Sequence, residues 1–271
     1  MPELSILGPL ILFLIVTGAV AGVLAGLLGV GGGVVLVPAF FYLFTALGYS
    51  SPDIMQVCLA TSLATIIVTS ARSVMAHNKR GAVEWRILRE WSPLIALGAL
   101  AGVGVVHQLS THVLQMVFGS LVFVIACYMI FGKSSWRLAD EMPGLGRRIL
   151  YAPVTGFLSV LLGIGGGSIG TPLMTLHNVA IHRAVATAAG FGVTIAVPSA
   201  IAFLLTPVDG APPMTVGAVN IPAFLIVIAT TMLTAPLGAT LAHKLDPKML
   251  KRVFAFFLAF VALNMLRKAL F

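Results

Sequence analysis

The chain has 271 residues, of which 59% are hydrophobic and only 9% are charged. Soluble domains carry about 25% charged residues, so this composition argues against a soluble enzyme, a nucleic-acid-binding protein and a disordered chain. The net charge of +8 comes from Lys and Arg in short loops between apolar segments, as the positive-inside rule describes, and we expect no nucleic-acid partner. Barrel strands alternate polar and apolar residues, whereas these segments are apolar throughout, which predicts an all-α polytopic membrane protein in a lipid bilayer.

Ten apolar segments follow one another along the chain, and each is predicted to be helical. They span residues 6–28, 34–47, 54–76, 91–107, 112–131, 149–162, 168–177, 183–205, 220–242 and 248–266. The second and seventh have about 10–14 residues, which corresponds to about 15–21 Å of helix and falls short of the hydrocarbon core. Each of these two short segments directly follows a glycine-rich break, GVGGG at residues 29–33 and GIGGG at residues 163–167.

The two breaks belong to an internal repeat. Residues 25–38 read AGLLGVGGGVVLVP and residues 159–172 read SVLLGIGGGSIGTP, 134 residues later. Two further pairs of blocks match in the same order, 59–62 with 185–188 and 102–118 with 238–254. We therefore expect two repeats, residues 1–135 and 136–271, within one membrane domain. Each repeat is predicted to hold one helix hairpin broken at the glycines and three transmembrane helices.

The charged loops orient the repeats in the membrane. Three loops are rich in Lys and Arg and are assigned to the cytoplasmic side; they are 77–90, 132–148 and 243–252. Loops 48–53 and 206–219 each carry one aspartate as their only charged residue and are assigned to the outer side. Each half contains five elements. Because five is an odd number, the second repeat starts on the opposite side of the membrane from the first, and the two repeats are expected to be inverted. Arg267 and Lys268 do not fit this assignment, since they end on the outer side.

Both halves share a set of features with a known family. Each carries its glycine-rich break, a proline five residues after the last glycine, and an Ala-Thr-Ser or Ala-Thr-Ala block on the next helix. In these features the sequence resembles the sulfite exporter TauE/SafE family of membrane transporters. The resemblance implies a secondary transporter or exporter of small sulfur-containing anions, such as sulfite or an organosulfonate, and we expect it in a bacterial inner membrane. Ser168 stands where the first repeat has Val34, so the substrate site is expected to be chemically asymmetric.

The glycine-rich breaks are the first candidate site for that small anionic substrate. Glycine lets the backbone leave the helical region, and hydrocarbon tolerates unwound backbone only inside protein or along a cavity. The helix that follows presents free N–H groups and a positive dipole end, which suits an anion. The expected substrate-binding residues are Gly31, Gly32, Gly33, Gly165, Gly166, Gly167 and Ser168. The alternative for glycines is close helix packing, which better fits Gly18, Gly22 and Gly26 and also Gly98 and Gly102.

Hydroxyl and guanidinium groups form a second set of candidates. Thr61, Ser62 and Thr187 are able to donate to oxyanion oxygens or to bond back to carbonyls of their own helices, and the sequence leaves both open. Arg72 and Arg183 lie near the expected cytoplasmic ends of their helices. One alternative is that these arginines contact the anion or restrict the cytoplasmic opening of its pathway. The other is that they extend to the membrane interface.

The apolar segments lack several kinds of reactive side chain, which reduces the number of functions expected for this chain. All eight carboxylates fall outside these segments, so we expect neither a proton relay nor a tight Na⁺ site within the membrane. No histidine pair has metal-ligand spacing and no nucleophile has a base nearby, so we expect no enzyme, no metal and no cofactor. The leading hypothesis is a secondary anion transporter. The alternatives are a transporter of another small anion or a metal cation, and a non-transporting membrane assembly subunit; the oligomeric state stays open.

Overall fold

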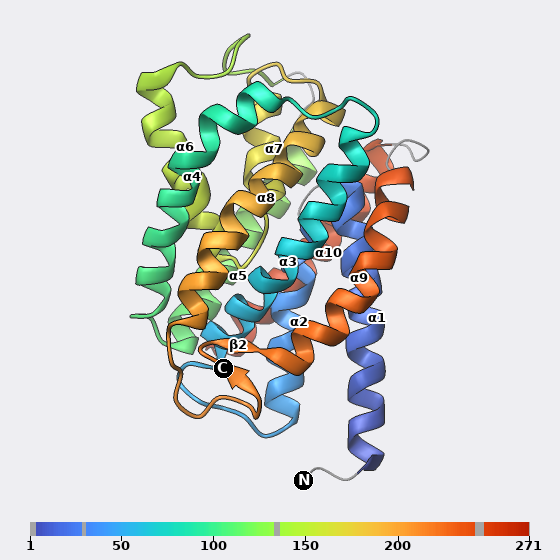
Figure 1. Ribbon diagram of the computed structural model, residues 1–271, viewed down its shortest axis with the longest axis vertical. Coiled ribbons are helices and arrows are strands. Elements are labelled where there is room, and N and C mark those ends of the chain that lie inside the picture. Colours follow the sequence, from blue (N-terminus) through green and yellow to red (C-terminus); the bar gives the residue numbers. More distant parts are fainter. Residues whose placement is uncertain (1–3, 29–30, 133–135, 242–246, 271) are drawn as a thin grey trace.

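The computed structural model describes residues 4–28, 31–132, 136–241 and 247–270, and in these it is an all-α bundle (Figure 1). The helices are α1 (Leu4–Leu28), α2 (Gly33–Ala46), α3 (Ile54–Asn78), α4 (Trp85–Val106), α5 (Thr111–Phe131), α6 (Leu145–Leu161), α7 (Gly167–Leu176), α8 (Ile181–Leu204), α9 (Ile221–Leu241) and α10 (Pro247–Leu270). Within the described ranges, α1, α3, α5, α8 and α9 are long and apolar enough to cross a membrane. The predicted helical segments are confirmed, and the chain is polytopic.

The cytoplasmic loop predicted over 77–90 is shorter than expected, because α4 begins at Trp85 and not at residue 91. Arg86 and Glu90 lie on exposed turns of this helix, where the Arg86 Nε is 3.0 Å from a Glu90 carboxylate oxygen. Such an i, i+4 pair supports a polar helical turn beyond the apolar stretch from which the start was predicted. Residues 243–246 of the loop predicted over 243–252 lie outside the described ranges, and its remaining residues belong to α10, which begins at Pro247.

The outer loop predicted over 206–219 contains a short hairpin that the sequence pattern did not indicate. Its strands are β1 (Thr215–Val216) and β2 (Val219–Asn220), which pair antiparallel. The turn between them depends on Gly217, whose φ of +57° lies in the left-handed region. The side-chain amide of Asn220 donates to the Pro213 carbonyl and to the Thr215 hydroxyl, so the hairpin is fixed by polar contacts and not by an alternating apolar pattern.

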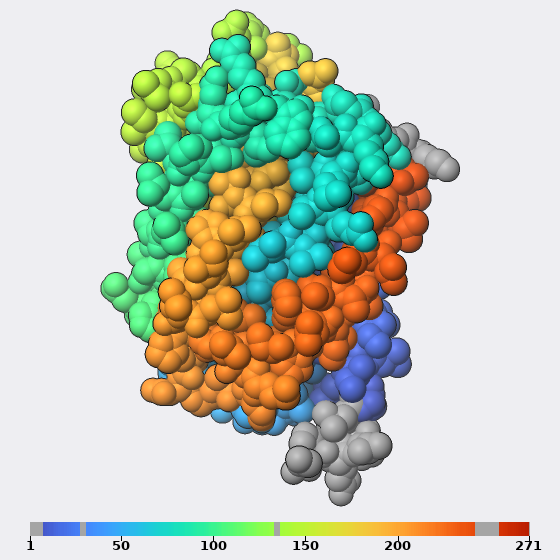
Figure 2. All heavy atoms as spheres, in the orientation of Figure 1, coloured from blue at the N-terminus to red at the C-terminus, as the bar shows by residue number. Residues whose placement is uncertain are grey.

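The helices of the two halves pack in a reciprocal pattern. α3 packs against α8 and α5 against α10, while α1 packs against α9 just as α4 packs against α6. α3 also contacts α9, and α8 contacts α4. The space-filling view shows part of α3 between α8 and α9 on one face of the molecule (Figure 2). All six pairings join a helix of the first half to a helix of the second, and exchanging the two halves maps this set of pairings onto itself.

Small residues bring the outer helices into backbone contact. A Cβ atom on Gly26 of α1 would lie 2.0 Å from the Ala235 carbonyl oxygen of α9, and one on Gly98 of α4 would lie 2.0 Å from the Pro153 carbonyl oxygen of α6. Gly18, Gly22 and Gly102 are similarly enclosed by the facing helix. The predicted packing role of these glycines is confirmed, and it draws α1 against α9 and α4 against α6.

The α4–α6 contact makes a prediction about stability. Gly98→Ala places a methyl group against the α6 backbone, and such overpacking costs about 1–3 kcal/mol. We expect a lower unfolding temperature for the detergent-solubilised protein. Gly104→Ala is the matched control, because a Cβ atom at Gly104, on the same helix, has no neighbour within 4 Å. Equal unfolding temperatures for the two variants would contradict the described contact.

Candidate substrate site

The two glycine-rich breaks are regions of left-handed backbone, each followed by a new helix. Gly31 and Gly32 have φ values of +74° and +79°, and Gly163 has a φ of +56°, a region that favours glycine. α2 begins at Gly33 and α7 at Gly167. Residues 29 and 30 of the first predicted break lie outside the described residues.

The breaks contact each other through their backbones. A Cβ atom on Gly31 would lie 3.2 Å from the Gly165 Cα, and one on Gly33 would lie 2.1 Å from the Gly163 carbonyl oxygen. Gly32 is enclosed differently, since a Cβ atom there would lie 2.8 Å from the Ala21 carbonyl oxygen of α1. The structure therefore brings the predicted glycines of both halves to one point.

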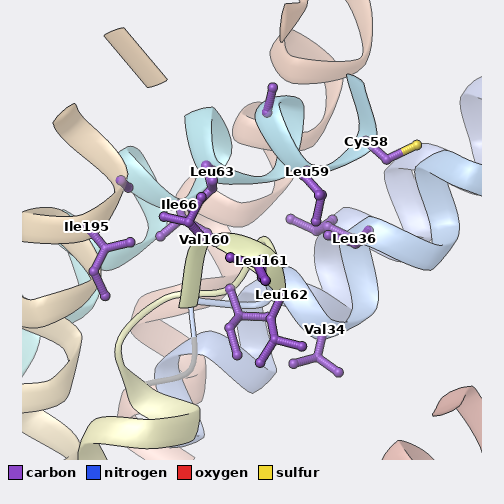
Figure 3. Packing of buried hydrophobic residues seen from close by; sticks show 14 of the residues in the cluster. Val34, Leu36, Cys58, Leu59, Leu63, Ile66, Val160, Leu161, Leu162 and Ile195 are labelled. Atoms are coloured by element: carbon purple, nitrogen blue, oxygen red, sulfur yellow. The ribbon is translucent and has the colours of Figure 1, made fainter. Parts of the chain in front are cut away.

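Apolar side chains surround this meeting point. Leu36 of α2, Leu59 of α3 and Leu162 beside the second break are buried and lie close together in the view of the core (Figure 3). A Cβ atom on Gly163 would meet Leu59 and Val37 at 2.7 Å. The breaks are therefore sealed within the bundle in this conformation.

The start of α7 offers unpaired hydrogen-bond donors. In the described part of the chain, no acceptor pairs with the backbone N–H groups of Gly167, Ser168 and Ile169, as is usual for a first helical turn. The Ser168 side chain is 6% exposed, and its Oγ has no hydrogen-bond partner among the described residues. Gly166 and Gly167 are buried with it. The counterpart of Ser168 at the start of α2 is Val34, which is buried and apolar.

Ser70 of α3 is a further candidate that the sequence analysis did not single out. Its side chain is buried, and its Oγ has no partner within the described ranges. A Cβ atom on Gly192 of α8 would lie 2.3 Å from this Oγ and 3.7 Å from the Gly165 Cα. The Ser70 hydroxyl therefore occupies the space that Gly192 leaves open beside the second break. The only sequence signal is the repeat alignment, in which Gly192 stands opposite Ile66.

The three predicted hydroxyl candidates all bond to backbone groups outside their own helices. The Ser62 Oγ donates to the Gly163 carbonyl over 2.7 Å and so ties α3 to the second break. The Thr61 Oγ1 accepts from the Asn220 N–H, and the Thr187 Oγ1 accepts from the Glu84 N–H, each over 2.9 Å. Asn220 and Glu84 directly precede α9 and α4, so Thr61 and Thr187 anchor the starts of these helices.

The structure does not bring the two predicted arginines to the breaks. Arg72 and Arg183 are exposed, whereas Gly31 and Gly165 are buried. Arg183 forms an ion pair with Glu84 at the start of α4. A second ion pair joins Arg148 of α6 to Glu90 of α4. Two glutamates at the start of α4 therefore bind arginines of the second half.

Comparison with known proteins places the chain among membrane transporters. The family model described as sulfite exporter TauE/SafE matches residues 14–265. A probable membrane transporter protein of Haemophilus influenzae is 31% identical over 95% of this chain and 98% of its own length. Probable membrane transporter proteins of Methanocaldococcus jannaschii and Bacillus subtilis are 28% and 25% identical, over 93% and 95% of this chain and 94% and 98% of their own lengths. No solved structure matches the chain.

The anchoring role of Thr187 makes a prediction. Thr187→Val keeps the side-chain shape but leaves the Glu84 N–H without its acceptor, which costs about 1–3 kcal/mol for a buried group. We expect a lower unfolding temperature. Thr206→Val is the control, because the Thr206 hydroxyl bonds back to Ala202 within its own chain segment. A Thr187→Val variant as stable as this control would show that the anchor contributes nothing.

Proposed function

The chain belongs to the sulfite exporter TauE/SafE family of membrane transporters, and from this premise we propose that it carries a small sulfur-containing anion, such as sulfite or an organosulfonate. The family description supplies the sulfur chemistry, while the relatives are named only as probable membrane transporters. The anion is proposed to bind between the two glycine-rich breaks. A bacterial inner membrane is the proposed location.

The observation that carries this proposal is the set of buried, unpaired donors at the second break. Within the described residues, the Ser168 hydroxyl and the first N–H groups of α7 have no acceptor. An unpaired buried polar group costs about 1–3 kcal/mol, and a ligand that accepts hydrogen bonds removes this cost. The helix start adds a partial positive charge of roughly half a unit. These groups are donors, so they favour an anion over a metal cation.

The two sides of the proposed site differ in their free hydroxyls, since the Thr69 hydroxyl at the first break donates to the Gly31 carbonyl. Ser168, Ser70 and Gly192 line the second break, whereas the first break meets Ile66, whose Cγ2 would lie 3.1 Å from a Cβ atom on Gly31. Partial charges and hydroxyls suit a singly charged anion better than a strongly hydrated dianion. The proposed substrate is therefore singly charged, as bisulfite and small sulfonates are.

An inverted repeat explains how such a site opens to each side in turn. The reciprocal packing supports a two-fold relation between residues 1–135 and 136–271, whose boundary falls next to residues outside the described ranges. We assign α1, α2, α3 and α9 to one moving group and α6, α7, α8 and α4 to the other. The α3–α8 contact and the contact between the breaks then form the seam that separates during transport.

The proposed site makes a prediction for transport. Ser168→Ala and Ser70→Ala each remove one donor to the anion, worth about 1.4 kcal/mol or a tenfold rise in KM. The measurement is sulfite and sulfonate flux into proteoliposomes that contain the purified protein. Thr45→Val is the control, because the Thr45 hydroxyl bonds to Phe41 of its own helix.

A KM unchanged in both serine variants, with normal insertion, would exclude this site. Wild-type protein that moves neither sulfite nor any sulfonate would exclude the proposed substrate class.

A further inference from the structure

The C-terminal end of α10 carries two basic residues at the end of the bundle that the loop charges assign to the outer side. Arg267 and Lys268 are exposed, and within the described residues neither forms an ion pair with a carboxylate. The Lys268 Nζ lies 4.3 Å from the centre of the Tyr42 ring of α2, a cation–π contact. Lys268 thus lies against an aromatic ring.

A shallow groove runs along the same face of α10. It has a volume of about 220 Å³ and is lined by Phe260, Leu263, Asn264 and Arg267. These positions are spaced by three, four and seven residues, so they share one helix face. Phe260 and Leu263 are 66% and 57% exposed. The groove is therefore apolar at one end and basic at the other, over about 10 Å of helix.

Asn264 is the polar group between these ends. Its side chain is half-buried, and no hydrogen-bond partner for it occurs in the part of the chain that the structure describes. An unsatisfied amide within a membrane helix is costly. One helical turn separates Asn264 from Arg267, so both side chains are able to donate to the same oxyanion. Guanidinium and amide donors suit phosphate oxygens.

We propose that this groove binds one anionic phospholipid of the outer leaflet. Its phosphate contacts Arg267 and Asn264, and one acyl chain lies along Leu263 and Phe260. Two other occupants fit the groove less well. A soluble anion leaves its exposed apolar end uncovered, and a second copy of this chain places two more cations next to Arg267 and Lys268. A lipid with a net negative charge satisfies both the apolar and the basic end.

The test compares lipids and charge-matched variants of the purified protein in detergent. Phosphatidylglycerol is expected to raise the unfolding temperature more than phosphatidylcholine does, because a ligand that binds the folded state stabilises it. Arg267→Gln is expected to weaken phosphatidylglycerol binding about fivefold, from roughly 1 kcal/mol per basic residue. Arg147→Gln, which removes an exposed arginine of α6, is the control and is expected to bind like wild type. Asn264→Leu is expected to weaken binding without any change of charge.

Three results would overturn the proposal. They are equal binding by wild type and Arg267→Gln, the same stabilisation by inorganic phosphate alone, and a dimer that is lost in Arg267→Gln irrespective of the lipid. None of these measurements depends on transport, so they stand apart from the proposed substrate.

Discussion

Two stretches of non-helical backbone touch inside the bundle, Gly33 against Gly163 and Gly31 against Gly165. Hydrocarbon cannot satisfy such backbone, so it has to be enclosed by protein. α3 and α8 supply the enclosure: Ser62 of α3 bonds to the Gly163 carbonyl, and Gly192 of α8 lies against Gly165. Because a single Cβ atom would separate the breaks, glycine at these positions determines how the two halves fit together.

Within the described residues, unpaired hydroxyls lie beside the second break, whereas the Thr69 hydroxyl beside the first break donates to the Gly31 carbonyl. Ser168 and Ser70 bring hydroxyls to the second break, whereas Val34 and Ile66 occupy the positions at and facing the first. A transporter needs a site that binds its substrate without trapping it. In the proposed site, neutral donors and a helix dipole serve this need, since each contributes only a modest, partial charge. The basic residues Arg72 and Arg183 stay at the surface.

Local patterns were enough to predict the helices, the two breaks and the packing glycines. An apolar run defines a membrane helix, and a four-residue glycine spacing defines a contact face. Neither pattern depends on which other helix packs against it. The roles of Thr61 and Thr187 were not predictable in this way, because their acceptor atoms serve Asn220 and Glu84 of the other half. Ser70 was missed for the same reason, since its surroundings depend on Gly192, far away in the sequence.

In the proposed site, neutral donors at the breaks hold the anion, so that charge moves with the substrate alone. The most direct measurement is the reversal potential of sulfonate flux in proteoliposomes, with the membrane potential and the pH gradient imposed separately. One negative charge is expected to move per permanently ionised sulfonate, with no driving force from the pH gradient. Uphill sulfonate movement driven by a pH gradient at zero potential would contradict it, because a proton-binding group would then have to take part.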